Sequence, residues 1–157
     1  MHMSSPNTSS TDSIRKQITL RASRSRVWRA LTDSSEFGQW FGVAFEGPFR
    51  VGEKISGQIT HKECDHMIFD AWIDRMDAED TFVFRWQPQD ISEGVDKSSQ
   101  PSTVVTFVLA DADDGTLLTV TESGFDALPE SSRMEVFSRN EGGWTAQMDN
   151  IRKHVDA

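Results

Sequence analysis

Large aromatic side chains gather in a few short stretches of this chain, and their spacing limits the folds that it can adopt. The sequence has ten phenylalanines and five tryptophans among 157 residues. In Phe82–Trp86 the aromatics recur at every second residue, which is typical of one face of a β-strand. Trp144 and Met148 begin a stripe at helical spacing that ends at Val155. Two faces this bulky must meet, and they either fill a core or line an apolar cavity.

The length of the chain suits one domain with one hydrophobic core, which we place at residues 14–157. Residues 1–13 are rich in Ser, Thr, Pro and Asn, so we expect a disordered tail. Its first residues, Met1–Met3, resemble a cloning remnant. The N-terminus lacks the charged and then apolar order of a signal peptide, and no apolar run is long enough to span a membrane.

The charge balance indicates which partners are unsuitable. A formal net charge of −9 makes the surface acidic, and an acidic surface repels phosphate backbones and anionic lipids. We therefore expect neither nucleic acids nor membranes as partners. Cys64 is the one cysteine, so no internal disulfide can form, and this favours a reducing, cytoplasmic location.

The N-terminal part of the domain predicts a strand and two short helices. Apolar and polar residues alternate from Ile14 to Leu20, as in a half-buried strand. Ser23 can cap a helix over residues 24–31. Asp33 followed by Glu36 resembles a capping box for a second helix, which Gly42 would end.

The remainder predicts consecutive strands and then a C-terminal helix. Pro129 suits the first position of a helix, and Gly142 and Gly143 should produce a kink or a close packing contact within it. Strands joined by short turns form an antiparallel sheet, and only the terminal helix is long enough to cover its aromatic face. The predicted strands are residues 43–45, 54–61, 67–76, 81–87, 103–109 and 116–123, and the predicted helical stretches are 130–139 and 144–155.

Six segments in this order carry a resemblance to a known superfamily. The chain resembles the START-like, or SRPBCC, proteins with their helix-grip fold, and among them the family named for the activator of the heat-shock protein 90 ATPase. The resemblance extends from Ile14 to Val155. Each motif is weak alone, and their order and spacing together are specific. The segments are Val27–Thr32, Phe37–Phe41, Phe82–Trp86, Thr103–Phe107, Gly115–Phe125 and Gly143–Trp144, the last followed by Met148 and Ile151.

The resemblance implies an α+β fold in which a curved antiparallel sheet of about six to seven strands grips the C-terminal helix. Members bind lipids, sterols, polyketides or other apolar molecules, and some are cyclases or hydrolases. The eukaryotic co-chaperone domain stimulates a chaperone ATPase. The family shares no catalytic triad, so it transfers no catalytic residue to this chain. Many relatives have His where this chain has Glu122.

The candidate ligand-binding residues are those that should point into the space between the sheet and the terminal helix. They either fill the core completely or leave a gap for an apolar ligand, and the sequence leaves both alternatives open. The set comprises Trp40, Phe84, Trp86, Phe107, Val120, Glu122, Trp144 and Met148.

Glu122 is the most informative of these residues because it shares a strand face with Leu118 and Val120. A carboxylate on an apolar face must be paired or take up a proton. It could anchor the polar end of a ligand, or act as a general acid or base. Alternatively, it lies close enough to the strand end to reach water or a loop backbone.

No metal or cofactor site is expected. His61, Cys64 and His66 match no standard zinc spacing, and a solvated turn explains them better. Asp111, Asp113 and Asp114 lack the glutamate that would complete an EF-hand loop. There is no nucleophile elbow and no phosphate-binding glycine loop.

Three functions follow from these features. The first is a non-enzymatic binding module for a small apolar or amphipathic molecule. The second, which rests on the family resemblance, is an interaction domain that modulates a chaperone ATPase. The third is a cyclase or hydrolase that uses Glu122 as acid or base, although the sequence identifies no second catalytic group. A monomer and a homodimer are both compatible with the sequence.

Overall fold

A single antiparallel sheet forms the framework of the molecule in the computed structural model, which describes residues 12–60, 68–87 and 101–156. Seven strands lie in the order β1-β7-β6-β5-β4-β3-β2, and each neighbouring pair is antiparallel. The strands are β1 (Ser13–Leu20), β2 (Val43–Phe45), β3 (Lys54–Ile59), β4 (Ile68–Asp77), β5 (Thr81–Trp86), β6 (Thr103–Ala112) and β7 (Gly115–Ser123).

Four helical segments within the described residues accompany the sheet, and local capping explains where the two short α-helices begin and end. They are α1 (Arg24–Thr32), α2 (Ser34–Phe41), the 3-10 turn η2 (Phe125–Ala127) and α3 (Glu130–Asp156). Ser23 accepts a hydrogen bond from the backbone N–H of Arg26, and Asp33 caps α2 in the same way. Gly42 ends α2 with a φ of 96°, a left-handed conformation that suits glycine.

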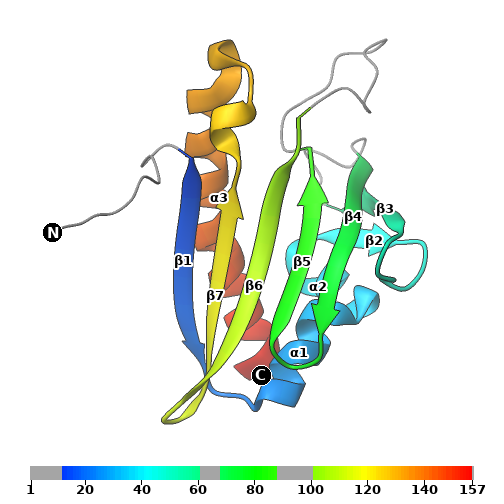
Figure 1. Ribbon diagram of the computed structural model, residues 1–157. Coiled ribbons are helices and arrows are strands. Elements are labelled where there is room, and N and C mark those ends of the chain that lie inside the picture. Colours follow the sequence, from blue (N-terminus) through cyan, green and yellow to red (C-terminus); the bar gives the residue numbers. More distant parts are fainter. Residues whose placement is uncertain (1–11, 61–67, 88–100, 157) are drawn as a thin grey trace, which may run out of the picture.

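The terminal helix α3 crosses one face of the sheet, with α1 and α2 near its C-terminal end (Figure 1). Its apolar stripe of Trp144, Met148, Ile151 and Val155 is buried. Trp144 and Trp86 come together with ring centroids 5.9 Å apart, so the aromatic faces of helix and sheet do meet. The predicted α+β helix-grip architecture is therefore confirmed, with the sheet at the upper end of the expected strand number.

The close packing contact expected at the glycines of α3 is not found among the described residues, and the two predicted helical stretches form one helix. The helix continues without interruption from Glu130 to Asp156. A Cβ atom at Gly142 or Gly143 would meet no atom within 4 Å, so neither glycine serves a close contact. Both are exposed on the side of the helix that faces away from the sheet. Packing of the opposite, apolar side compensates for the low helix propensity of glycine.

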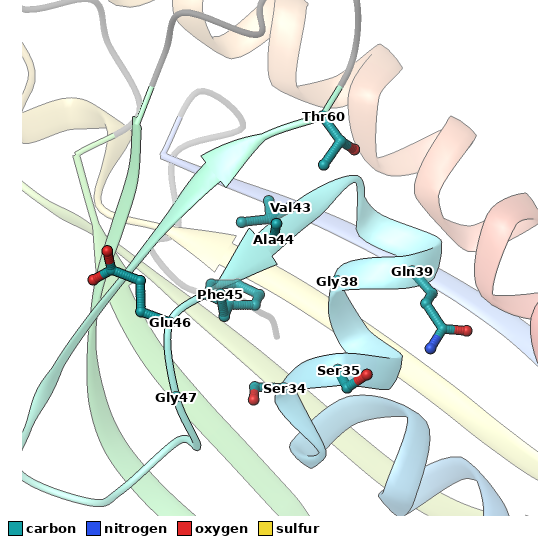
Figure 2. A pocket seen from close by; sticks show the side chains of 10 residues that line it. All are labelled: Ser34, Ser35, Gly38, Gln39, Val43, Ala44, Phe45, Glu46, Gly47 and Thr60. Carbon is teal, nitrogen blue, oxygen red and sulfur yellow. The ribbon is translucent and has the colours of Figure 1, made fainter.

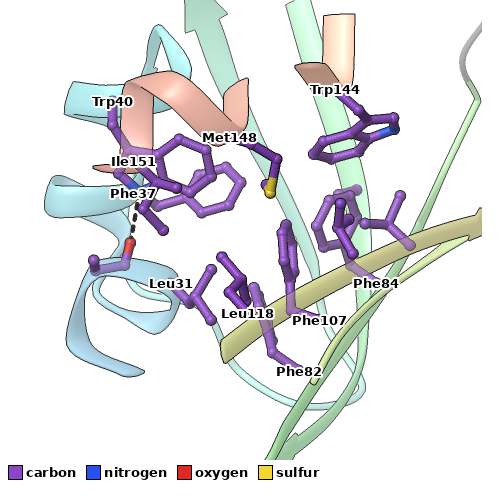
Figure 3. Packing of buried hydrophobic residues seen from close by; sticks show 14 of the residues in the cluster. Leu31, Phe37, Trp40, Phe82, Phe84, Phe107, Leu118, Trp144, Met148 and Ile151 are labelled. Atoms are coloured by element: carbon purple, nitrogen blue, oxygen red, sulfur yellow. Dashed lines mark hydrogen bonds between the residues drawn. The ribbon is translucent and has the colours of Figure 1, made fainter. Parts of the chain in front are cut away.

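Aromatic rings from separate elements form the core between the sheet and the helices (Figure 3). Phe82 and Phe84 of β5 contact Phe107 of β6, and Phe37 of α2 packs edge-on against Phe84. These rings are fully or almost fully buried. The alternation read from the sequence therefore identified the core side of these strands.

Strand register brings three chemically important residues to the same end of the sheet. Trp86, the last residue of β5, pairs with Thr103, the first of β6. Glu122 of β7 pairs with Val105, two residues further along β6. Since residues two apart on a strand share a face, Thr103 and Val105 face the same side. These pairings place Trp86, Thr103 and Glu122 close together.

Two predicted features lie wholly or mainly outside the described residues: the N-terminal tail and the His61–His66 cluster. Among the helices of the described ranges, none combines the length and the apolar character needed to cross a membrane.

Candidate functional site

The carboxylate of Glu122 is completely buried between the sheet and α3. Its side of β7 carries Leu118 and Val120, as the alternation of the sequence predicted. All three residues are 0% exposed. The alternative expectation, that Glu122 reaches water or a loop backbone, is wrong because Glu122 is fully buried and its carboxylate accepts from side chains of neighbouring strands and of α3.

Four side chains among the described residues donate hydrogen bonds to this carboxylate. The indole Nε1 of Trp86 lies 2.7 Å from Oε2, and that of Trp144 lies 2.8 Å from Oε1. Thr103 donates its hydroxyl to Oε2 at 2.5 Å. Asn140 uses a single nitrogen, Nδ2, to contact Oε1 at 3.1 Å and Oε2 at 3.2 Å. The site therefore joins β5, β6 and β7 to the helix α3.

The donors to Glu122 that the described ranges contain are neutral. An ionised carboxylate only accepts hydrogen bonds, and two indoles, a hydroxyl and an amide supply what it requires. Within the described ranges, no Lys, Arg or His forms an ion pair with Glu122. Oriented dipoles, rather than an opposite charge, stabilise this buried group.

The two tryptophans that donate to the carboxylate form a cluster of three rings with Phe41. Phe41, Trp86 and Trp144 have centroid separations of 6.0 Å, 6.0 Å and 5.9 Å, so each ring contacts the other two. We call these residues the aromatic triad. Trp144 is 2% exposed, whereas Phe41 and Trp86 are only partly buried. The triad therefore reaches the surface on the side of Phe41 and Trp86.

The other predicted site residues occupy different surroundings. Phe84, Phe107, Val120 and Met148 are buried in the core, and Phe107 contacts the ring of Trp144 at 5.8 Å. Trp40 lies further along the helical side, where its indole Nε1 donates to the backbone oxygen of Ala30 at 2.8 Å (Figure 3). That bond joins α2 to α1, and Trp40 forms no recorded bond to Glu122.

Sequence analysis missed Thr103, Asn140 and Phe41 as members of the site. Asn140 precedes Trp144 by four residues, so the two lie on the same side of α3. The sequence could have indicated Asn140, because it is a polar residue on the side of α3 that carries the apolar stripe from Trp144 to Val155. Thr103 could be found only from strand register, because the sequence alone does not specify which residues of β6 lie opposite β5 and β7.

A surface hollow of about 500 Å³ lies at a different place, between α2 and β2 (Figure 2). Beside the hollow, α2 lies directly against the backbone of β2. Gly38 allows this contact, since a Cβ there would lie 2.0 Å from the backbone oxygen of Val43. None of the predicted site residues belongs to the hollow. Its lining consists of Ser34, Ser35, Gly38, Gln39, Val43, Ala44, Phe45, Glu46, Gly47 and Thr60.

The described part of the chain contains no group of three or more His, Cys, Asp or Glu side chains that could hold a metal ion. Asp113 and Asp114 form the turn between β6 and β7, as expected for a hairpin.

Comparisons with known proteins identify the family and the fold. The profile of the family described as "Activator of Hsp90 ATPase homolog 1-like protein" matches residues 21–156, which is most of the chain. No significant match exists among curated protein sequences.

Several solved structures share this fold. DynU16, from the dynemicin biosynthetic locus, superposes with a TM-score of 0.73 at 23% identity, covering 93% of this chain but only 48% of DynU16. The chain thus spans about half the length of that protein. Protein MLL2253 from Mesorhizobium loti gives 0.72 at 18% identity, with coverage of 92% and 96%. The Aha1 dimer from Colwellia psychrerythraea gives 0.68 at 16% identity, again with coverage of 92% and 96%. Identities this low establish the fold alone.

Proposed function

This chain belongs to the family of Activator of Hsp90 ATPase homolog 1-like proteins, and from that premise we propose that it binds a small apolar or amphipathic molecule at the aromatic triad. The ligand's apolar body would insert between the rings of Phe41, Trp86 and Trp144. Its polar end would reach Glu122. A reducing cytoplasm is the proposed place of action, because Cys64 has no partner for an internal disulfide.

One observation carries this proposal: a fully buried carboxylate lies beside rings that reach the surface. Burial of an ionised group is a poor way to gain stability, since apolar residues of similar volume usually stabilise a core as well or better. A polar group at the inner end of an aromatic surface is the usual arrangement for orienting a ligand.

The rings of the triad are in mutual contact, so a ligand must separate them on entry. Trp86 and Phe41 are partly exposed, so the ligand would enter on their side of the triad. Apolar area removed from water, at about 25 cal/mol per Å², would supply most of the affinity.

Binding is better supported than catalysis. General acid–base reactions usually need a second positioned group, and the recorded partners of Glu122 are two indoles, a hydroxyl and an amide. The proposal of a chaperone-modulating domain rests on the family description. No contact in the described residues favours it.

Removal of the Trp86 ring tests the proposal. We expect Trp86→Ala to weaken the binding of an apolar fluorescent dye at least tenfold, because the exposed wall of the site is lost. Trp28→Ala is the matched control, since Trp28 is also a partly buried tryptophan but lies on α1 outside the triad. Titration of the dye against each folded variant, with folding checked by circular dichroism, gives the comparison. Equal losses in the two variants would count against this site.

Native mass spectrometry of freshly purified protein is the complementary experiment. A co-purifying small molecule that is lost in Trp86→Ala and retained in Trp28→Ala would support the proposal and give the ligand's mass.

A further inference from the structure

The carboxylate of Glu122 is fully buried and, among the described residues, has no positively charged partner, unlike two carboxylates that are only partly buried. Glu36 contacts Arg26, Arg29 and His154. Asp70 lies 3.9 Å from Lys54. Glu122 is more deeply buried than either, yet within the described ranges its partners are all uncharged. A positive group that reached this carboxylate would be attracted more strongly than at an exposed site, although its own loss of hydration offsets part of the gain.

The aromatic triad supplies the apolar surroundings of this site. The indole N–H lies on the positive edge of its ring, so the ring edges turned to Glu122 hold the carboxylate and the ring faces remain for the ligand's apolar body. Trp86 and Trp144 both lie beside the carboxylate, since each donates its indole N–H to it. Phe41 completes the triad, 6.0 Å from each of them.

Asn140 occupies the position that an incoming donor would take. Its contacts of 3.1 Å and 3.2 Å are the longest in the site, and one nitrogen serves both oxygens. Its side chain is partly exposed, unlike Trp144 and Thr103. An ammonium group has three N–H donors, so it could replace both contacts of Asn140 with charge-assisted hydrogen bonds.

We propose that the ligand of this site carries an ammonium group, which Glu122 binds in place of Asn140 while the aromatic triad contacts the ligand's apolar body. This proposal rests on the proposed function and specifies its ligand class. An anionic ligand is disfavoured because it would bring a like charge against Glu122. A neutral ligand would make the apolar contacts but no charge pair with Glu122, so it should bind more weakly than an ammonium ligand.

Three naphthalene compounds that differ only in the polar group test the proposal on the unmodified protein. The probes are 2-naphthylmethylamine, 2-naphthylmethanol and 2-naphthoate, titrated by isothermal calorimetry at neutral pH and moderate salt. We expect the amine to bind at least tenfold more tightly than the alcohol, and the carboxylate to bind most weakly. Equal affinities of amine and alcohol would overturn the ammonium proposal and leave the proposed function standing. Absence of binding by all three would count against the proposed function itself.

A pair of matched variants separates the buried charge from general attraction to the acidic surface. Glu122→Gln should lower the affinity for the amine at least tenfold. Its affinity for the alcohol should stay within about twofold of that of the unmodified protein. Glu135→Gln removes one charge from an exposed position of the same helix, α3, and should change neither affinity. A similar loss of amine affinity in both variants would show that the surface charge, and not Glu122, attracts the amine.

Asn140→Ala provides an independent measurement if Glu122→Gln fails to fold. It leaves the carboxylate intact and removes the donor that competes with the ligand. We expect the amine to bind several-fold more tightly to this variant. An unchanged or weaker amine affinity in the folded variant would contradict the displacement of Asn140.

Discussion

At the scale of single residues, the chemistry of this protein centres on the oxygens of Glu122. Five hydrogen-bond contacts from four side chains reach this carboxylate. Each donor that is removed leaves a buried oxygen without its partner, and a buried polar group without its partner costs more than the bond itself contributes. A substitution that keeps the shape of a side chain but removes the N–H that it donates to Glu122 should therefore lower the stability of the protein.

Trp144→Phe is such a change, because it keeps an aromatic ring against Trp86 and deletes the indole donor to Oε1. We expect the free energy of unfolding to fall by about 1–3 kcal/mol. Urea denaturation followed by circular dichroism measures it. Trp28→Phe is the control. Trp28 is a partly buried ring whose indole N–H has no hydrogen-bond partner among the described residues, so this change should lower the free energy of unfolding less than Trp144→Phe does.

Repeating Trp144→Phe in a chain that lacks the acceptor tests whether the lost hydrogen bond causes the loss of stability. In Glu122→Leu the acceptor is absent, so Trp144→Phe should cost less there than in the unmodified chain. An equal cost in both backgrounds would assign the effect to ring size.

At the scale of whole elements, glycines have opposite roles in the helices α2 and α3. Gly38 lets α2 lie directly against β2, whereas Gly142 lies in open space on the outer side of α3. Neither has a positive φ, so both could adopt their conformation with a side chain. The space around the missing Cβ therefore decides the effect of an alanine.

Gly142→Ala should stabilise the protein by about 1 kcal/mol, because alanine has the higher helix propensity and meets no neighbour. Gly38→Ala should destabilise it by about 1–3 kcal/mol, because its Cβ would lie 2.0 Å from the oxygen of Val43. The two variants make the same chemical change in helices, so thermal unfolding compares them directly. Stabilisation by both would mean that α2 can move away from β2 at little cost.

Periodicity identified the elements because it is a local property of the sequence. Alternation in Phe82–Trp86 and in Leu118–Glu122 correctly indicated the buried sides of β5 and β7. The hydrogen bond between Trp86 and Glu122 joins residues 36 positions apart, and the bond from Trp144 joins a strand to a helix. Such contacts depend on register and on the position of α3 over the sheet, which no local pattern specifies. The sequence therefore indicated that Glu122 was an unusual residue without identifying its partners.

At the scale of the whole molecule, one carboxylate joins the three α-helices. Glu36 of α2 contacts Arg26 and Arg29 of α1 at 2.6 Å and 2.7 Å, and His154 near the end of α3 at 2.9 Å. The predicted capping box is therefore only half formed, since Asp33 caps α2 but the side chain of Glu36 has these other partners. The carboxylate of Glu36 therefore connects α3, which crosses the sheet, to α1 and α2, which follow β1.

The charge on Glu36 makes this connection dependent on pH. Burial by itself raises the pKa of its carboxyl, but the hydrogen bonds from His154, Arg26 and Arg29 outweigh burial and hold the pKa below its ordinary value of 4.5. Because the folded state binds this proton less readily than the unfolded chain, the stabilisation is fully present above about pH 4.5. It is lost as the pH falls through the lowered pKa.

Glu36→Gln should therefore remove part of the acid sensitivity of the whole fold. We expect the variant to be less stable than the unmodified protein at neutral pH, and the difference to shrink as the pH falls below about 4.5. Hydrogen bonds from Arg152 and Lys153 also lower the pKa of Asp149, but that group is present in both proteins and cancels in the difference. Urea denaturation across acidic and neutral pH supplies the measurement, with Glu135→Gln as the exposed control. A stability difference that stays constant with pH would show that Glu36 contributes packing and not charge to the junction of the three helices.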